Sequence, residues 1–214
     1  MRIAVLGGGG NLGGALAKRW ARHGHEVIIG SRDPNRVKPY ADEIGATPKT
    51  NADAAAAGEI VVITVPYANQ KAILDEIAPH VDGKIVVDTT VPLVPPRVMR
   101  VQLPAEGSAA AITQAKLGDK ARVVAAFHNV AAHKLAEDKP VACDVLVFGD
   151  DRAARATVIG LAEDAGLRGL HAGALVNSAS AEALTSVLIF LNKTYQVDGA
   201  GIQITGELVP PTEG

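Results

Sequence analysis

The 214-residue sequence predicts an α/β protein with a Rossmann-type, doubly wound and mainly parallel sheet. The first observation is a short apolar strand, residues 2–6, that runs directly into four consecutive glycines, Gly7 to Gly10. The second is the regular alternation of β-branched runs with helical patterns along the rest of the chain. We expect two parts, 1–142 as a nucleotide-binding domain and 143–214 as a smaller C-terminal α/β domain that completes a cleft.

The glycine-rich turn carries a dinucleotide-binding fingerprint. Gly8, Gly10 and Gly13 match G-x-G-x-x-G, in which the glycines allow a tight turn, close approach of the backbone to a pyrophosphate, and close packing of helix on strand. A helical pattern follows from Asn11 to His23. Its first amides would then point at a bound diphosphate.

The end of the second strand indicates which dinucleotide is preferred. NAD-binding proteins place an acidic residue there to bind the ribose 2′-hydroxyl, but this chain has Ser31 and Arg32 after residues 26–30. A hydroxyl and a guanidinium can bind a 2′-phosphate, which a carboxylate would repel. The sequence therefore favours NADP, with Arg36 as a second candidate cation. Asp33 precedes Pro34 and is predicted to be the N-cap of the next helix.

Strands and helices are expected to alternate along the rest of the chain. The predicted helices span residues 34–44, 51–57, 69–78, 108–117, 151–165 and 181–195, and the predicted strands span 46–48, 60–65, 85–88, 122–127, 144–148 and 167–172, with a closing strand near Ile202 and a frayed tail from Val209 to Gly214. Ligands bind outside the carboxyl ends of parallel strands. Pro66, Tyr67, Asp88, the proline-rich segment 89–104 and His128 are therefore expected to line a cleft. Ordinary packing remains the alternative for Tyr67 and His128, and capping of a loop for Asp88.

Composition restricts the possible partners. The formal net charge is −2, which favours neither nucleic acid nor an anionic membrane. Cys143 is the single cysteine, so no internal disulfide or cysteine metal site is expected, and a reducing cytoplasm is the simplest location. Asp150 and Asp151 precede a helix and are interpreted as cap and dipole partners, not as metal ligands.

The predicted helix 181–195 is the most apolar one, and its pattern indicates whether it could contact a membrane or another subunit. Its uninterrupted apolar run, Val187 to Leu191, is too short for a membrane helix. Residues 186–191 are apolar around most of that helix, which indicates burial on more than one side, for example at a subunit interface; we expect a homodimer.

With these residues described, the sequence resembles the NADPH-dependent reductases of coenzyme F420, an 8-hydroxy-5-deazaflavin, over almost its whole length. The stretches that carry the resemblance are GGGGNLGGAL, VIIGSRD, VVITVPY, KIVVDTTVPL, GSAA, VVAAFHNV, CDVLVFGDD and GAGIQITG. The resemblance implies NADP and coenzyme F420 as cofactors, with hydride passing directly and reversibly between them. The first domain would bind NADP, and the second would complete the F420 cleft.

The resemblance also implies site residues. NADP contacts fall on Gly8, Gly9, Gly10, Asn11, Leu12, Gly13, Ser31, Arg32 and Arg36, with the nicotinamide end near Pro66 and Tyr67. The F420 site falls on Val91, Pro92, Val94, His128, Asn129, Ala132 and the glycine-flanked Ala200. The family usually has threonine in place of Gly9 and proline in place of Ala131.

No catalytic residue is assigned, because no acid–base pair, nucleophile set or metal cluster stands out in the sequence. Two other classes stay open: an NADPH reductase of another acceptor, such as a flavin or a ferric chelate, and a non-catalytic NADP sensor.

Overall fold

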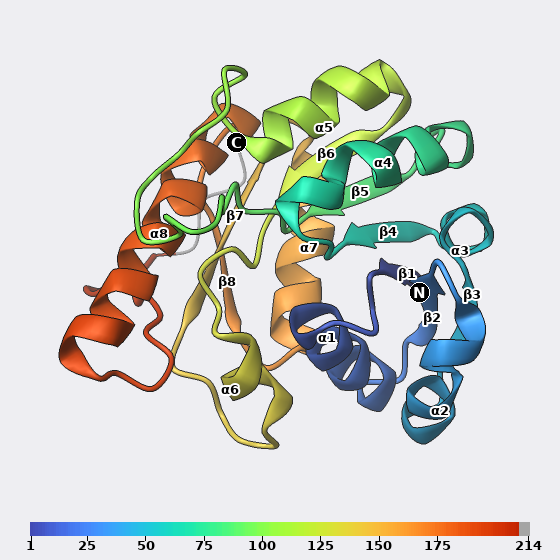
Figure 1. Cartoon of the computed structure of the whole chain (residues 1–214), viewed down its shortest axis with the longest axis horizontal. Helices are drawn as coiled ribbons and strands as arrows, with labels where there is room; N and C mark the ends of the chain where they lie inside the picture. Colours follow the sequence, from blue (N-terminus) through green and yellow to red (C-terminus); the bar gives the residue numbers. More distant parts are fainter. Residues whose placement is uncertain (210–214) are drawn as a thin grey trace.

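The computed structural model describes residues 1–209, which form one eight-stranded sheet with helices on both faces (Figure 1). The strand order is β3-β2-β1-β4-β5-β6-β7-β8, and every neighbouring pair is parallel except β6 and β7. The strands are β1 Arg2–Leu6, β2 Glu26–Ser31, β3 Thr47–Thr50, β4 Ile60–Ile63, β5 Ile85–Asp88, β6 Arg122–Ala125, β7 Asp144–Gly149 and β8 Arg168–His171. The predicted fold class is confirmed.

The helices cover the sheet in two layers. They are α1 Asn11–Arg22, α2 Pro34–Ile44, α3 Asn51–Ala57, α4 Tyr67–Ile77, α5 Ala109–Leu117, α6 Ala132–Ala136, α7 Arg152–Asp164 and α8 Ser178–Tyr195. Side chains alternate across β1, so that Ile3 and Val5 join the core beneath α1 and α7, while Ala4 and Leu6 join the core beneath α3 and α4. The sequence did not predict α6, because five residues are too few to show a helical period.

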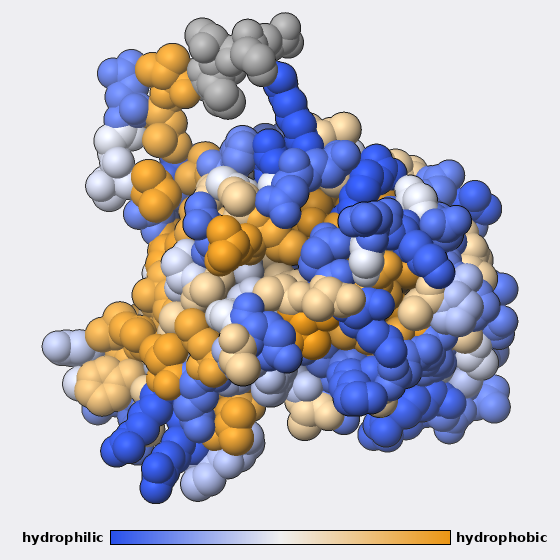
Figure 2. Space-filling model, turned by 90° about the horizontal axis from the view of Figure 1, so that it is seen from above, coloured by the Kyte–Doolittle hydropathy of each residue, from blue (hydrophilic) through white to orange (hydrophobic). Residues whose placement is uncertain are grey.

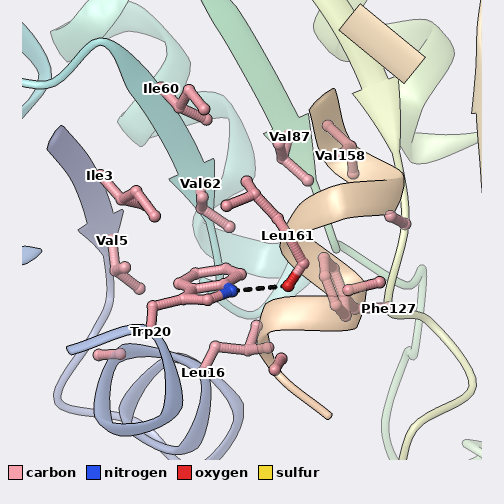
Figure 3. Close-up of a cluster of buried hydrophobic side chains, with 14 of the residues drawn as sticks. Ile3, Val5, Leu16, Trp20, Ile60, Val62, Val87, Phe127, Val158 and Leu161 are labelled. Atoms are coloured by element: carbon pink, nitrogen blue, oxygen red, sulfur yellow. Dashed lines mark hydrogen bonds between the residues drawn. The ribbon is translucent and has the colours of Figure 1, made fainter. Parts of the chain in front are cut away.

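Trp20 of α1 packs against residues from the second half of the chain in the first of these cores. Its ring is fully buried and meets Phe127 edge to face, with ring centroids 5.9 Å apart. Its Nε1–H donates to the carbonyl of Leu161 at 2.8 Å, as Figure 3 shows. This hydrogen bond fixes α1 against α7, so the helix that begins at the glycine turn is tied to the C-terminal part of the sheet.

The expected closing strand near Ile202 was wrong. The chain there contacts the start of β7 through single hydrogen bonds: Asp144 N donates to Ile202 O at 2.7 Å, and Ile204 N donates to Asp144 Oδ2 at 2.6 Å. Arg168 Nη2 donates to Ile204 O at 3.0 Å, and the Arg168 guanidinium also forms a salt bridge with the Asp144 carboxylate. Side chains thus occupy the amide and the carbonyl of Ile204, which a strand ladder would need. The predicted tail lies outside the described residues apart from Val209.

Helix α8 begins three residues earlier than predicted and carries much of the exposed apolar surface. Val187, Phe190 and Tyr195 are 43%, 49% and 70% exposed, and orange atoms gather on the side of Figure 2 that carries this helix. By length and composition alone, Leu175–Tyr195, with mean hydropathy 1.3, could cross a membrane, which the count of consecutive apolar residues did not reveal. A helix packed on a protein core has the same length and composition, and Glu182 of α8 is hydrogen-bonded inside the protein.

Candidate dinucleotide and acceptor site

The glycine turn between β1 and α1 is as tight as the fingerprint requires, but the roles shift by one residue. The left-handed conformation lies at Gly7, with φ of 81°, and not at Gly8. A Cβ at Gly8 would lie 2.9 Å from Val5 O, and one at Gly13 would lie 2.8 Å from Gly7 O. Both positions therefore require glycine for close packing. Thr64 Oγ1, at the end of β4, donates to Leu6 O at 2.8 Å and supports the turn.

The beginning of α1 has no side-chain cap. Its N-cap is Gly10, and its first turn contains no acidic residue, so the first amides are open to an anion. A Cβ at Gly9 would lie 2.7 Å from Val37 Cγ1 of α2. A side chain at this position would therefore require the Val37 side chain to shift.

A groove of about 350 Å³ opens beside this turn. It brings together six of the predicted residues: Gly9, Gly10, Ser31, Arg32, Arg36 and Pro66. Gly8, Asn11, Leu12, Gly13 and Tyr67 do not line it. Sequence reasoning missed further lining residues, including Asn51, Thr64, Asn69 and Glu76, which come from separate strand ends and from α4. Nothing in their local sequence marks them.

The positive charges of two arginines at one end of this groove are not balanced by any acidic side chain in the described part of the chain. Neither Arg32 nor Arg36 has a hydrogen-bond or ion-pair partner within residues 1–209, and both are exposed. Ser31 Oγ accepts from Asp33 N at 3.1 Å, and Asp33 caps α2 through Asn35 N at 3.0 Å, as predicted. Two free guanidiniums next to a hydroxyl form a site that a phosphate monoester can occupy.

The carboxyl end of β5 holds a buried polar network instead of an open ligand site. Asp88 is fully buried, accepts from Thr90 N at 2.7 Å, and accepts from Gln70 Nε2 at 2.9 Å. Burial raises the pKa of this carboxyl. Asp88 therefore caps the start of the proline-rich segment, the simpler of its two predicted roles.

His128 follows β6 at the neighbouring strand end. It is 6% exposed, and neither ring nitrogen has a hydrogen-bond partner in the described part of the chain. Burial lowers the pKa of the imidazole to about 4, so the ring is neutral at physiological pH. An unpaired buried polar group costs about 1–3 kcal/mol. The two unpaired ring nitrogens support a ligand role for His128, because a bound second cofactor could supply the missing hydrogen bond.

The other residues predicted for the second cofactor are spread over three segments. Pro92 is buried and Val91 half-buried after β5, while Val94 is 42% exposed. Asn129 is buried, and its Nδ2 donates to Ala181 O of α8 at 2.8 Å. None of these, nor His128, lines the arginine groove. Tyr67 is half-buried at the start of α4, and burial raises its pKa, as do the negative charges of Glu106 and Glu182.

A second cavity of about 340 Å³ lies between α6 and the C-terminal segment. Ala131, Lys134, Cys143, Gly199 and Gly201 are among the residues that line it. Ala132 and Ala200 lie next to lining residues but do not line it themselves. The Ala200 amide already donates to Asn192 Oδ1 at 2.7 Å, so a ligand would have to displace that contact.

A strand, glycine turn and helix that open a doubly wound sheet define a dinucleotide-binding oxidoreductase class. Residues 2–92 match the family model described as NADP oxidoreductase, coenzyme F420-dependent. The chain is 40% identical over 220 residues to the F420-dependent NADP reductase of Methanothermobacter thermautotrophicus, an alignment that covers 96% of this chain and 95% of the relative. It is 37% identical over 222 residues to that of Methanocaldococcus jannaschii, covering 96% of this chain and 98% of the relative.

A solved structure agrees with these relatives. A candidate F420-dependent NADP reductase from Arthrobacter sp. FB24 superposes with a TM-score of 0.85 at 29% identity, covering 95% of this chain and 99% of that one. The protein belongs to the family of F420-dependent NADP reductases.

Proposed function

We propose that this protein transfers hydride directly and reversibly between NADP(H) and coenzyme F420. The observation that carries the proposal is the agreement, over nearly the whole chain, with relatives named F420-dependent NADP reductases. The arginine groove supports the NADP half of the proposal, and the orphaned ring of His128 supports the F420 half. A flavin or ferric-chelate reductase and a non-catalytic sensor are less favoured, because the relatives align across both halves of the chain.

The NADP site is proposed at the glycine turn and the groove beside it. The amides that begin at Gly8, Gly9, Gly10, Asn11, Leu12 and Gly13 would bind the diphosphate, and Ser31, Arg32 and Arg36 would bind the 2′-phosphate. Pro66 and Tyr67 would contact the nicotinamide end. The F420 site is proposed at Val91, Pro92, Val94, His128, Asn129, Ala132 and Ala200, so that 1–142 binds NADP and 143–214 completes the F420 cleft.

The cofactors supply the redox chemistry, since a nicotinamide and a 5-deazaflavin exchange a hydride without a covalent carrier. The protein's own residues orient two rings face to face and exclude water. His128, being neutral, would donate or accept one hydrogen bond to the deazaflavin without transferring a proton.

The experiment is to mix the purified protein with NADPH deuterated at nicotinamide C4 and with oxidised F420. We expect loss of the deazaflavin's visible absorbance and deuterium at its C5 position, where a C–H bond does not exchange with water. Turnover with a flavin or a ferric chelate but not with F420 would favour the other reductase class. Tight NADPH binding without turnover with any acceptor would favour a sensor.

We further propose a homodimer in the cytoplasm, with the exposed face of α8 at the interface. Val187, Phe190 and Tyr195 give this helix an apolar outer surface of the kind that subunit contacts cover. Cys143 is a buried free thiol, which is compatible with a reducing compartment. Sedimentation velocity would test the dimer: Phe190→Glu should shift a dimer toward monomer, and a wild-type monomer would refute it.

A further inference from the structure

One face of α8 holds α5 in place. The carboxylate of Glu182 is 1% exposed and accepts from the amides of Ala109 at 2.6 Å and Ala110 at 3.1 Å. These are the first amides of α5, which follows directly after segment 89–108, the link from β5 to α5 that contains the proline-rich residues 89–104. Glu182 therefore caps α5 and fixes the exit of that segment.

The same face of α8 contacts two other segments. Thr185 Oγ1 donates to His128 O at 3.0 Å, and Ser186 Oγ donates to Arg100 O at 3.3 Å. Glu182 thus holds the end of segment 89–108, and Ser186 holds its middle. Thr185 holds the backbone of His128. All three belong to the acceptor side of the cleft.

The start of the proline-rich segment is fixed by the second buried acid. Asp88 accepts from Thr90 N, and Gln70 Nε2 joins Asp88 Oδ2 to Ala109 O, at 2.9 and 2.8 Å. Among residues 1–209, no cation pairs with Asp88 or Glu182. Burying an acid without a cation costs stability. The network therefore secures the position of this segment at the expense of stability, a pattern expected near functional sites.

We propose that Glu182 is a positioning residue for the F420 site: by capping α5 from α8, it holds segment 89–108 and His128 in the arrangement that hydride transfer requires. This inference rests on the proposed function. Displacement of a site by about 1 Å can cost about 100-fold in rate. Glu182 does not line the groove that contains Arg32 and Arg36, so we expect its replacement to change NADPH affinity much less than F420 affinity.

The test compares Glu182→Gln with Glu163→Gln. Glutamine keeps the size of the side chain but replaces one accepting oxygen by an NH₂ group, which cannot accept an amide of α5. Glu163 is exposed on α7, so its variant controls for the loss of one negative charge. We expect Glu182→Gln to weaken F420 binding by about tenfold or more and to lower kcat, while NADPH affinity stays within about twofold. Each ligand is titrated separately, and folding is monitored by circular dichroism.

Thr185→Val and Ser186→Ala extend the test should Glu182→Gln fail to fold, since each removes only hydroxyl contacts to the acceptor side. Both should weaken F420 binding more than NADPH binding. Equal F420 affinity and turnover in these variants and in the wild type would overturn the inference, as would parallel losses for both ligands. A wild-type protein that does not reduce F420 would instead refute the proposed function.

Discussion

Replacement of Arg32 by alanine should remove most of the preference for NADPH over NADH. Arg32 lines the groove beside the glycine turn and has no partner within residues 1–209, so no existing ion pair has to break when a phosphate binds. The 2′-phosphate distinguishes NADPH from NADH, and Arg32 follows directly after β2, where this group is read.

The expected magnitude follows from the charge and exposure of the site. A hydrogen bond to a charged group contributes about 1.5–3 kcal/mol, which corresponds to about 10- to 150-fold in kcat/KM. Because the guanidinium is exposed, water and salt screen it, and the lower half of that range is expected at physiological ionic strength. The efficiency with NADH should change by less than about twofold, because NADH offers no phosphate there.

The assay measures kcat/KM for both nucleotides at two salt concentrations, in the wild type, Arg32→Ala and Arg36→Ala. Lys120→Ala is the matched control, since Lys120 is exposed, lies outside the groove and carries the same charge. Its nucleotide preference should equal that of the wild type. Equal efficiency with NADH and NADPH in the wild type, or an unchanged ratio in Arg32→Ala, would refute the reasoning.

The remaining predictions concern buried polar groups. His128→Ala should weaken F420 binding and leave NADPH affinity within a few-fold; because burial lowers the pKa of His128 to about 4, no activity step near pH 6.5 should depend on it, which pH–rate profiles of both proteins can check. Trp20→Phe removes one of the two hydrogen bonds that the Leu161 carbonyl accepts, the other coming from Ala165 N at 3.1 Å, and should cost about 0.5–1.5 kcal/mol in urea unfolding; an unchanged midpoint would contradict this. Burial raises the pKa of Glu182 from an ordinary 4.5 to about 7, with the nearby Asp88 acting in the same direction. The folded state then binds more protons than the unfolded state, so the free energy of unfolding should fall by about 3 kcal/mol as pH rises from 4.5 through 7. Glu182→Gln should flatten that slope.

Sequence reasoning succeeded where structure is set by neighbouring residues. The glycine turn, the alternation of strands and helices, and the caps at Asp33 and Asp151 all follow from local patterns, and the structure confirms them. It failed near Ile202, where a closing strand was expected but the distant Asp144 and Arg168 bind the backbone groups of Ile202 and Ile204. A pattern of apolar residues cannot show which distant side chain competes for a hydrogen bond.

The acceptor side of the cleft was harder to predict than the groove for the same reason. In sequence, Glu182 looks like an ordinary polar position of a helix, and Gln70 like a solvated one, yet both are buried at the junction of three segments. Their role depends on α8 returning from the end of the chain to lie beside α5.

Different parts of the chain build the arginine groove and the proposed F420 site, so substitutions can change one site without changing the other. The groove is built by residues 7–76, consecutive elements around the first strands of the sheet. In the proposed F420 site, α8 holds segment 89–108 and the backbone of His128 through Glu182, Thr185 and Ser186. We therefore expect a substitution on the inner face of α8 to alter the choice or orientation of the acceptor while the nucleotide site stays intact. Such a division allows one NADP-binding scaffold to serve different acceptors through changes near its C-terminus.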